Sequence, residues 1–229
     1  MAIVEYMPDV IVVLGDWWDF PSLNNHCEPG SDELEGSRWQ ADLDAGNEAF
    51  RRLVAPMNKE LARRLKGHLK RWVPLKVFLG GNHEDRADRV ARTTPKWQGV
   101  IGSHKCETLD FERHPFLEIV DIDGILYSHY FANTHSGRSI GGSIENRLNK
   151  IGRSFVQGHE QGLLYGIKQF PGKLRRHGMV AGSFYQHDEK YRGLQSNGEW
   201  RGIVVLNEVQ DGDYNVMPLS MDYLRRKFS

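Results

Sequence analysis

Four polar residues follow four separate apolar segments of this chain, and their side chains are of types that bind metal ions. Asp16, Asn82, His129 and His159 each stand at or just past the end of such a segment. In open α/β sheets, polar groups at the carboxyl ends of strands gather in one place, so we expect these four to converge. One carboxylate oxygen, one amide oxygen and two imidazoles suit Mn²⁺, Zn²⁺, Fe²⁺ or Ni²⁺ better than Ca²⁺. The pattern therefore predicts a site for a divalent transition metal.

Each of these residues also has an ordinary interpretation. A Gly-Asp or Gly-Asn pair after a strand is commonly only a turn, and a single histidine commonly serves only as a hydrogen-bonding group. The metal hypothesis therefore depends on the ordered succession of all four.

Hydropathy predicts the elements that position these side chains. The β-branched run 9–16 predicts a strand buried on both faces at the centre of a sheet, and residues 75–85 predict a second strand that leads into a helix. Residues 116–130 predict a hairpin that turns at Asp123-Gly124. Residues 141–152 predict a short helix, followed by a strand that reaches His159.

A long helix is predicted between Ala41 and Trp72. Apolar residues recur there four apart, at Leu53, Met57, Leu61, Leu65 and Leu69. Pro56 is expected to split or kink this helix.

The second half of the chain is rich in predicted strands, at 163–170, 178–185, 201–209 and 214–219. Alternating strands and helices early, with strands late, predict a layered α/β sandwich rather than a barrel. The 229 residues are expected to form a single domain spanning 1–229, with a surface loop at 22–37.

Composition limits the location and the partners of the protein. The 30 basic and 30 acidic side chains cancel, so no overall field favours nucleic acid or a membrane, and any polyanion site must be local. No apolar run approaches the roughly 20 residues of a membrane span. Cys27 and Cys106 are too few for a disulfide framework. We expect a cytoplasmic protein without a membrane partner.

The polar motifs resemble those of the calcineurin-like metallophosphoesterases. GDWWD (15–19), GNHE (81–84), the histidine of YSHY (127–130) and GHEQ (158–161) match, in order, the family's GDxxD, GNHE, strand-end histidine and GHxH motifs. The similarity covers residues 10 to about 165. Two later segments, GSFYQHDEKYRG (182–193) and EWRGIVVLNEV (199–209), are similar to the tail of phosphoesterases found in bacteriophages. If a phage encodes the chain, the expected location is the host cytoplasm. The resemblance implies a layered α/β/β/α sandwich.

The family implies a role for each matched residue. The metal ligands would be Asp16, Asn82, His129 and His159. His83 would instead face the scissile phosphate as general acid or electrostatic stabiliser, and Asp19 would accept a hydrogen bond from its ring. Glu84 and Asp85 are expected to be solvated residues at a helix start.

Two departures from the family pattern suggest a single metal ion. The family's opening Asp-x-His motif is missing from the fourteen residues before Gly15, and Gln161 replaces the second histidine of GHxH. In the family these residues serve the first metal, whereas every ligand of the second is present. The resemblance thus implies one ion, with Mn²⁺ expected first and Zn²⁺, Fe²⁺ or Ni²⁺ as alternatives. Truncation is a rival explanation for the missing motif, but it does not explain Gln161.

The missing family strand would leave a sheet edge open, which a homodimer could cover.

With one ion, other groups must contact the phosphate. The candidates are Arg86, His135, Arg138 and Gln161, of which two lie in the glycine-rich segment 133–143. An ordinary mobile loop is the alternative for that segment.

DNA is the expected substrate, and a nuclease the expected activity. The resemblance to phage enzymes, whose DNA-repair-exonuclease relatives cut DNA, implies this substrate. The basic stretches 63–72 and 173–178 could also follow a nucleic-acid backbone, and their alternative interpretation is a solvated helix face and a solvated hairpin. Trp17 and Trp18 could stack on a base or belong to the core. A small-molecule phosphodiesterase or phosphomonoesterase is the main alternative, and a non-catalytic binding module with a structural metal is the second.

Overall fold

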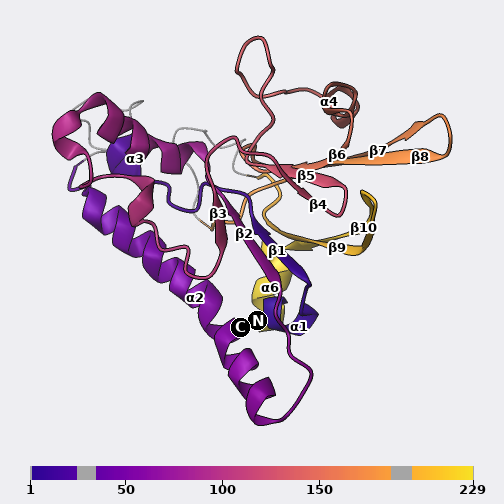
Figure 1. Ribbon diagram of the computed structural model, residues 1–229, viewed down its shortest axis with the longest axis horizontal. Helices are drawn as coiled ribbons and strands as arrows, with labels where there is room; N and C mark the ends of the chain where they lie inside the picture. Colours follow the sequence, from indigo (N-terminus) through magenta and orange to yellow (C-terminus); the bar gives the residue numbers. More distant parts are fainter. Residues whose placement is uncertain (1, 25–34, 187–197, 229) are drawn as a thin grey trace. The chain divides into compact units, whose positions relative to one another are not determined.

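The computed structural model describes residues 2–24, 35–186 and 198–228 of a mixed α/β protein (Figure 1). The chain divides into two compact units, Met1–Phe116 and Leu117–Ser229. The elements of unit 1 are α1 Ala2–Tyr6, β1 Val10–Val13, η1 Pro21–Leu23, α2 Trp39–Lys66, β2 Leu75–Leu79, α3 Asn82–Thr93, η3 Pro95–Trp97, η4 Ser103–Lys105 and β3 Glu112–His114. Those of unit 2 are β4 Val120–Ile122, β5 Ile125–Ser128, α4 Ile144–Ile151, β6 Ser154–Gln157, β7 Leu163–Phe170, β8 Leu174–Ala181, β9 Gly202–Gln210, β10 Asp213–Ser220 and α6 Met221–Phe228. Whether the units act as a single domain stays a prediction.

Unit 1 is built on a parallel three-stranded sheet in the order β1-β2-β3. The βα succession predicted at residues 75–85 is confirmed, because β2 leads directly into α3. The central position predicted for the first strand is wrong within the described part of the chain. There β1 pairs only with β2, and all four of its residues are partly exposed. A β-branched run marks a strand, but it does not tell how many neighbours the strand has.

The long helix α2 is continuous through Pro56, so of the two predicted outcomes the split is wrong, whereas a kink at Pro56 stays a prediction. The core side of α2 is formed by Leu43, Asn47, Phe50, Val54 and Met57. Burial of these side chains along the same helix offsets the hydrogen bond that proline cannot donate.

The predicted apolar stripe is also wrong at its C-terminal end, since Leu65 is 46% exposed. Leu69, also 46% exposed, lies beyond Lys66, where α2 ends short of the predicted Trp72. A strict spacing of four residues drifts around a helix of 3.6 residues per turn, whereas the buried set alternates threes and fours and stays on one side.

Aromatic side chains form the core of unit 1. Trp18 is 1% exposed and stacks on Phe50 of α2, with ring centroids 5.6 Å apart, and it meets Phe78 of β2 edge to face. Trp17 packs edge to face on Phe50 and donates from Nε1 to the Gly46 carbonyl oxygen at 3.1 Å. Both tryptophans therefore belong to the core, and the base-stacking alternative is not favoured.

Gly46→Ala is expected to lower the free energy of unfolding by about 2 kcal/mol. A Cβ at this position would lie 2.0 Å from Cδ1 of Trp18, whose ring is held by Phe50 and by a 3.0 Å hydrogen bond to Asn47. The clash outweighs the gain of roughly 1 kcal/mol that alanine brings inside a helix. Urea denaturation measures the change. Gly141→Ala, whose Cβ meets nothing within 4 Å, is the control, and equal stability of the two variants would contradict the expectation.

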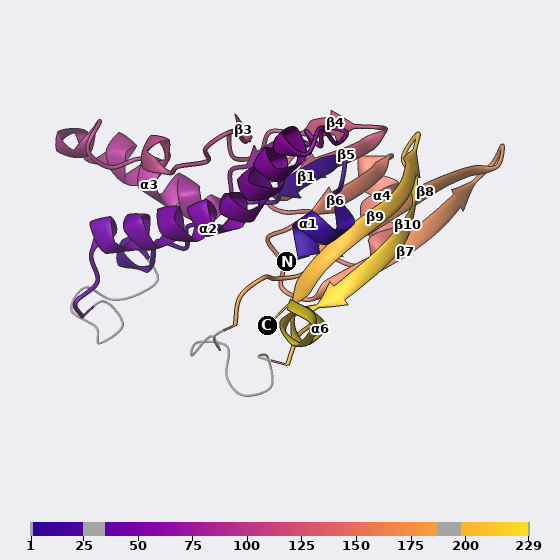
Figure 2. The same ribbon diagram turned by 90° about the horizontal axis from the view of Figure 1, so that it is seen from below.

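Unit 2 contains a five-stranded sheet in the order β4-β5-β6-β8-β7 and an antiparallel β9–β10 pair (Figures 1 and 2). The predicted hairpin is confirmed, because β4 and β5 pair antiparallel around Asp123-Gly124. β5, β6 and β8 run parallel, so their carboxyl ends lie at one edge of the sheet. The predicted helix is confirmed as α4, which begins after the N-cap Ser143 and ends before Gly152.

The two faces of this sheet are covered differently. Successive residues of a strand point to opposite faces. On β8, a Cβ at Gly178 would touch Ile144 of α4, whereas His177 contacts Asp213 and Tyr214 of β10. Unit 2 is thus layered as helix, sheet and β-ribbon.

Among the described residues, none of the helices combines the length and apolar character that a membrane crossing requires. Cys27 and part of the loop predicted at 22–37 lie outside the described residues.

Candidate functional site

In unit 1, Asp16 is held at a tight turn directly after β1. Gly15 and Asp16 have φ angles of 89° and 55°, so the chain turns through the left-handed region as it leaves the strand. Asp16 Oδ1 accepts a 3.0 Å hydrogen bond from the backbone N–H of His83, in the first turn of α3. The amide groups of a helix start favour a negative charge, so α3 orients the Asp16 carboxylate. Asn82 begins α3 and lies between two residues that approach Asp16.

Glu84 is buried, contrary to the solvated position predicted for it. Only 1% of Glu84 is exposed, and its carboxylate accepts backbone N–H groups of Gly81, Trp18 and Asp16 at 2.7, 2.9 and 3.0 Å. Burial raises the pKa of the Glu84 carboxyl group, and the nearby Asp16 adds to this, while the three N–H donors oppose it. Glu84 therefore ties the turn after β1 to the start of α3. Glu84 stands three residues after the helix N-cap, as in a capping box, and this position is a sequence signal that could have predicted its bonds to backbone N–H groups.

Asp85 is partly buried, and its carboxylate lies 3.0 Å from the guanidinium of Arg92.

His83 and Asp19 pair as the sequence predicts. His83 Nδ1 lies 2.5 Å from Asp19 Oδ1, and this hydrogen bond holds the pKa of Asp19 below its ordinary value. On the other side of the ring, His83 Nε2 lies 3.0 Å from Nη2 of Arg86. A guanidinium can only donate, so Nε2 accepts and the ring proton is on Nδ1, facing Asp19. Asp19 and Arg86 together determine the tautomer and orientation of this imidazole.

Arg86 is the one predicted phosphate contact that the structure places beside His83 within unit 1. It also donates from Nη1 to the backbone carbonyl oxygen of Asp19 at 3.1 Å, and its side chain is 14% exposed.

A cavity of about 410 Å³ in unit 1 lies beside α3, on a face of the helix different from that of His83 and Arg86. The α3 side chains that line it are Glu84, Asp85, Asp88 and Arg92. The cavity is therefore not where the His83 imidazole points.

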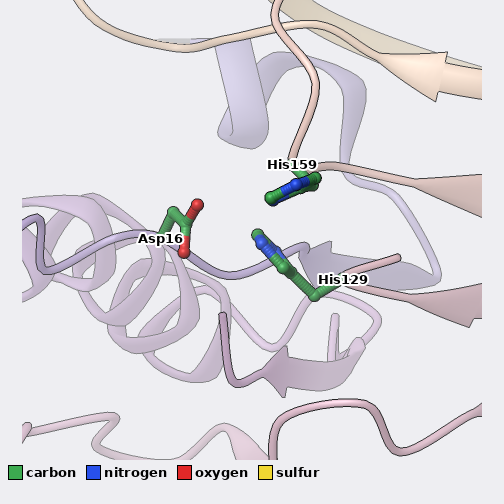
Figure 3. Close-up of side chains that lie close together, drawn as sticks. All are labelled: Asp16, His129 and His159. Atoms are coloured by element: carbon green, nitrogen blue, oxygen red, sulfur yellow. The ribbon is translucent and has the colours of Figure 1, made fainter. Parts of the chain in front are cut away.

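In unit 2, the parallel pairing of β5 with β6 brings two histidines together. Ser128 is opposite Gln157 in the register, and beyond them Gly158 N donates to the His129 carbonyl oxygen at 3.0 Å. The imidazole rings of His129 and His159 meet edge to face with centroids 5.2 Å apart, and each offers a ring nitrogen within 4.8 Å of the other (Figure 3). His129 is 1% exposed whereas His159 is exposed, so the pair has one buried side and one open side.

His135 and Arg138 lie on an exposed turn that its own hydrogen bonds shape. Asn133 Oδ1 accepts the N–H groups of His135 and Ser136 at 2.9 and 3.2 Å, and Asn133 N donates to the Arg138 carbonyl oxygen. Their contact with phosphate stays a prediction.

Gln161 has a definite neighbour. Its Oε1 accepts a 2.6 Å hydrogen bond from the hydroxyl group of Tyr185. The guanidinium of Arg201 lies over the ring of the same tyrosine, 4.6 Å from its centroid. The Gln161 side chain is therefore engaged within unit 2, and its contact with phosphate stays a prediction.

Comparisons with protein-family models, with curated proteins and with solved structures found no match. The resemblance to the metallophosphoesterases therefore rests on the motifs quoted above.

Proposed function

We propose that the protein is a metal-dependent phosphoesterase, most simply a nuclease that hydrolyses phosphodiester bonds in DNA. One observation carries the proposal: His83 is paired with Asp19 through Nδ1, and its Nε2 faces Arg86 at the start of α3. A histidine with one nitrogen fixed by a carboxylate and the other beside a cation is arranged for phosphate chemistry. A purely structural site has no need of such a group.

The chemistry of the donor set fits a divalent transition metal. Asp16, His129 and His159 offer a carboxylate oxygen and two imidazole nitrogens, and we propose that they bind the same ion together with Asn82. The two imidazoles are already adjacent within unit 2. We propose one ion per chain, with Mn²⁺ preferred. When bound, the ion would supply Lewis-acid stabilisation of the charge on a phosphoryl oxygen.

The chain's own residues would act from α3. Arg86 donates to the phosphate oxygens, which draws its guanidinium away from His83 Nε2. Nε2 can then take up a proton and donate it toward the phosphate group, while Asp19 keeps the ring in place through Nδ1. Glu84 holds the turn that carries Asp16 and Trp18 against the same helix start.

Exposed basic residues favour DNA as the substrate. Lys66, Lys70 and Arg71, at and after the end of α2, are exposed and could follow a sugar–phosphate backbone.

A small-molecule phosphodiester or phosphomonoester is the second candidate. The observation that favours it is the internal pairing of other basic groups, since Arg63 pairs with Glu60 and Arg175 with Asp213. Comparing cleavage of plasmid and single-stranded DNA with cleavage of a bis-phenyl phosphodiester, with Mn²⁺ and with chelator, separates the two.

Metal content tests the proposal most directly. Protein purified without chelator is expected to hold one equivalent of divalent metal, and chelator is expected to abolish cleavage. His159→Asn is expected to weaken Mn²⁺ binding at least tenfold, because one imidazole ligand is lost, while asparagine tolerates the left-handed backbone (φ 65°) at that position. Calorimetric titration measures this. His68→Asn, at an exposed histidine with φ 52°, is the matched control.

Two bound ions would refute the single-ion proposal. Absence of any bound metal, with no cleavage on adding Mn²⁺, would refute the metal-dependent phosphoesterase itself.

A further inference from the structure

The backbone at His159 is strained. Its φ angle is 65°, and Glu160 N donates to the Gly158 carbonyl oxygen at 2.7 Å, which closes a three-residue turn around His159. Non-glycine residues adopt such turns only where the surroundings hold them. The direction of the His159 imidazole therefore depends on what fixes the residues on either side.

On one side, the turn is fixed by the carboxyl ends of the neighbouring strands β5 and β6. Gly158 N donates to the His129 carbonyl oxygen at 3.0 Å, so the first residue of the turn continues the pairing of β6 with β5.

On the other side, the turn is fixed by an ion pair in which the arginine is buried and the glutamate is partly exposed. Nη1 and Nη2 of Arg147 contact Oε1 and Oε2 of Glu160 at 2.6 and 2.7 Å, so both carboxylate oxygens are held. The Arg147 side chain is only 2% exposed, and its Nε donates to the Gly142 carbonyl oxygen at 2.9 Å. Arg147 belongs to α4, which packs on the same sheet and is capped at its N-terminus by Ser143. A rigid helix thus holds the residue next to His159 in the chain.

We propose that Arg147 and Glu160 are positioning residues that hold the His159 imidazole in the orientation that binds the metal. The inference rests on the proposed metal site and adds the residues that set its geometry. The pair is suited to orientation because two parallel hydrogen bonds between planar groups fix angle as well as distance. Stability alone gives little reason for it, since apolar residues of similar size often serve a buried position as well as an ion pair does.

The first test measures metal affinity. Glu160→Gln and Arg147→Lys, of which the latter keeps the charge but not the forked geometry, are expected to weaken Mn²⁺ binding about 10–100-fold by calorimetric titration. The control is Asp121→Asn, which removes an exposed pair with Arg153 at 2.8 Å in the same unit and is expected to leave affinity unchanged. Unchanged affinity in both test variants would overturn the proposal.

A second variant separates positioning from folding. Arg147→Met combined with Glu160→Met replaces the pair by apolar side chains and is expected to keep the fold, as checked by circular dichroism. A positioning role predicts that this folded protein still binds Mn²⁺ at least tenfold more weakly than the parent. Parent-like affinity would show that the pair is only structural.

A metal-free readout distinguishes failure of this inference from failure of the proposed function. Without metal, Glu160→Gln is expected to shift the NMR signals of the His159 ring while leaving those of the exposed His104 in place. Unshifted His159 signals would overturn the positioning role, even in a parent protein that binds Mn²⁺. A parent that binds no Mn²⁺ would overturn the proposed metal site, and the ring signals would still decide the role of the pair.

Discussion

His83→Ala is expected to lower kcat for a phosphodiester by about 10²–10⁴-fold while leaving the bound metal unchanged. His83 is the imidazole that Asp19 and Arg86 orient from two sides, and its proposed role is to act on the phosphate rather than to bind the ion. Its backbone N–H, which holds Asp16, is retained in the alanine variant. The loss should therefore appear in kcat more than in metal content.

Steady-state kinetics on a bis-phenyl phosphodiester and on DNA, with metal analysis of the same preparations, measure both quantities. His104→Ala removes an exposed histidine of the same unit and is expected to be neutral. If His83→Ala reduced the metal content, His83 would be a ligand rather than a phosphate-facing group. If it altered neither cleavage nor metal, His83 would have no role in acting on the phosphate. A parent protein that bound one ion but cleaved neither substrate would be better described as a non-catalytic module with a structural ion.

Gly81→Ala is expected to lower the free energy of unfolding by about 3 kcal/mol and to reduce phosphodiester cleavage at least 100-fold. A Cβ at this position would lie 2.1 Å from Asp16 Oδ1, 2.4 Å from Asp16 N and 2.8 Å from Glu84 Oε2. The φ angle of −96° suits alanine, so the cost is steric alone. Neither neighbour can move freely, because Asp16 N is bonded to Glu84 and Asp16 Oδ1 to the N–H of His83. The carboxylate of Asp16 must therefore shift.

Urea denaturation and initial rates with Mn²⁺ measure the two effects of Gly81→Ala. Gly198→Ala is the matched control, since its Cβ would meet nothing within 4 Å and its φ angle is not positive. Full activity in Gly81→Ala would show that the position of Asp16 is not critical, which would count against its role as a ligand.

Several elements could be predicted from the sequence because their signals are local. Continuous apolar runs ended by glycine marked β2 and β6, the Asp123-Gly124 pair marked the turn between β4 and β5, and Ser143 and Gly152 bound α4. The pairing of His83 with Asp19 was expected from motifs alone. Ligand types at strand ends are also local information, because a strand ends where its apolar run does.

The neighbours of each strand, and the partners of each polar side chain, were decided only by the tertiary structure. A β-branched run did not indicate that β1 is an edge strand in the described sheet. The fourfold leucine spacing did not indicate that α2 ends at Lys66 with Leu65 exposed. Glu84 looked like a solvated first-turn acid, yet packing of the turn after β1 supplies it with three backbone donors.

Arg147 shows the same limit most clearly. It is one arginine on a short amphipathic helix, thirteen residues from Glu160, and nothing local distinguishes it from a surface arginine. Chain sequence specifies backbone preferences and side-chain chemistry over a few neighbouring residues. The packing of buried faces determines which groups distant in the chain come into contact. That packing therefore decides which charged side chains are paired, which are buried and which are accessible to a ligand.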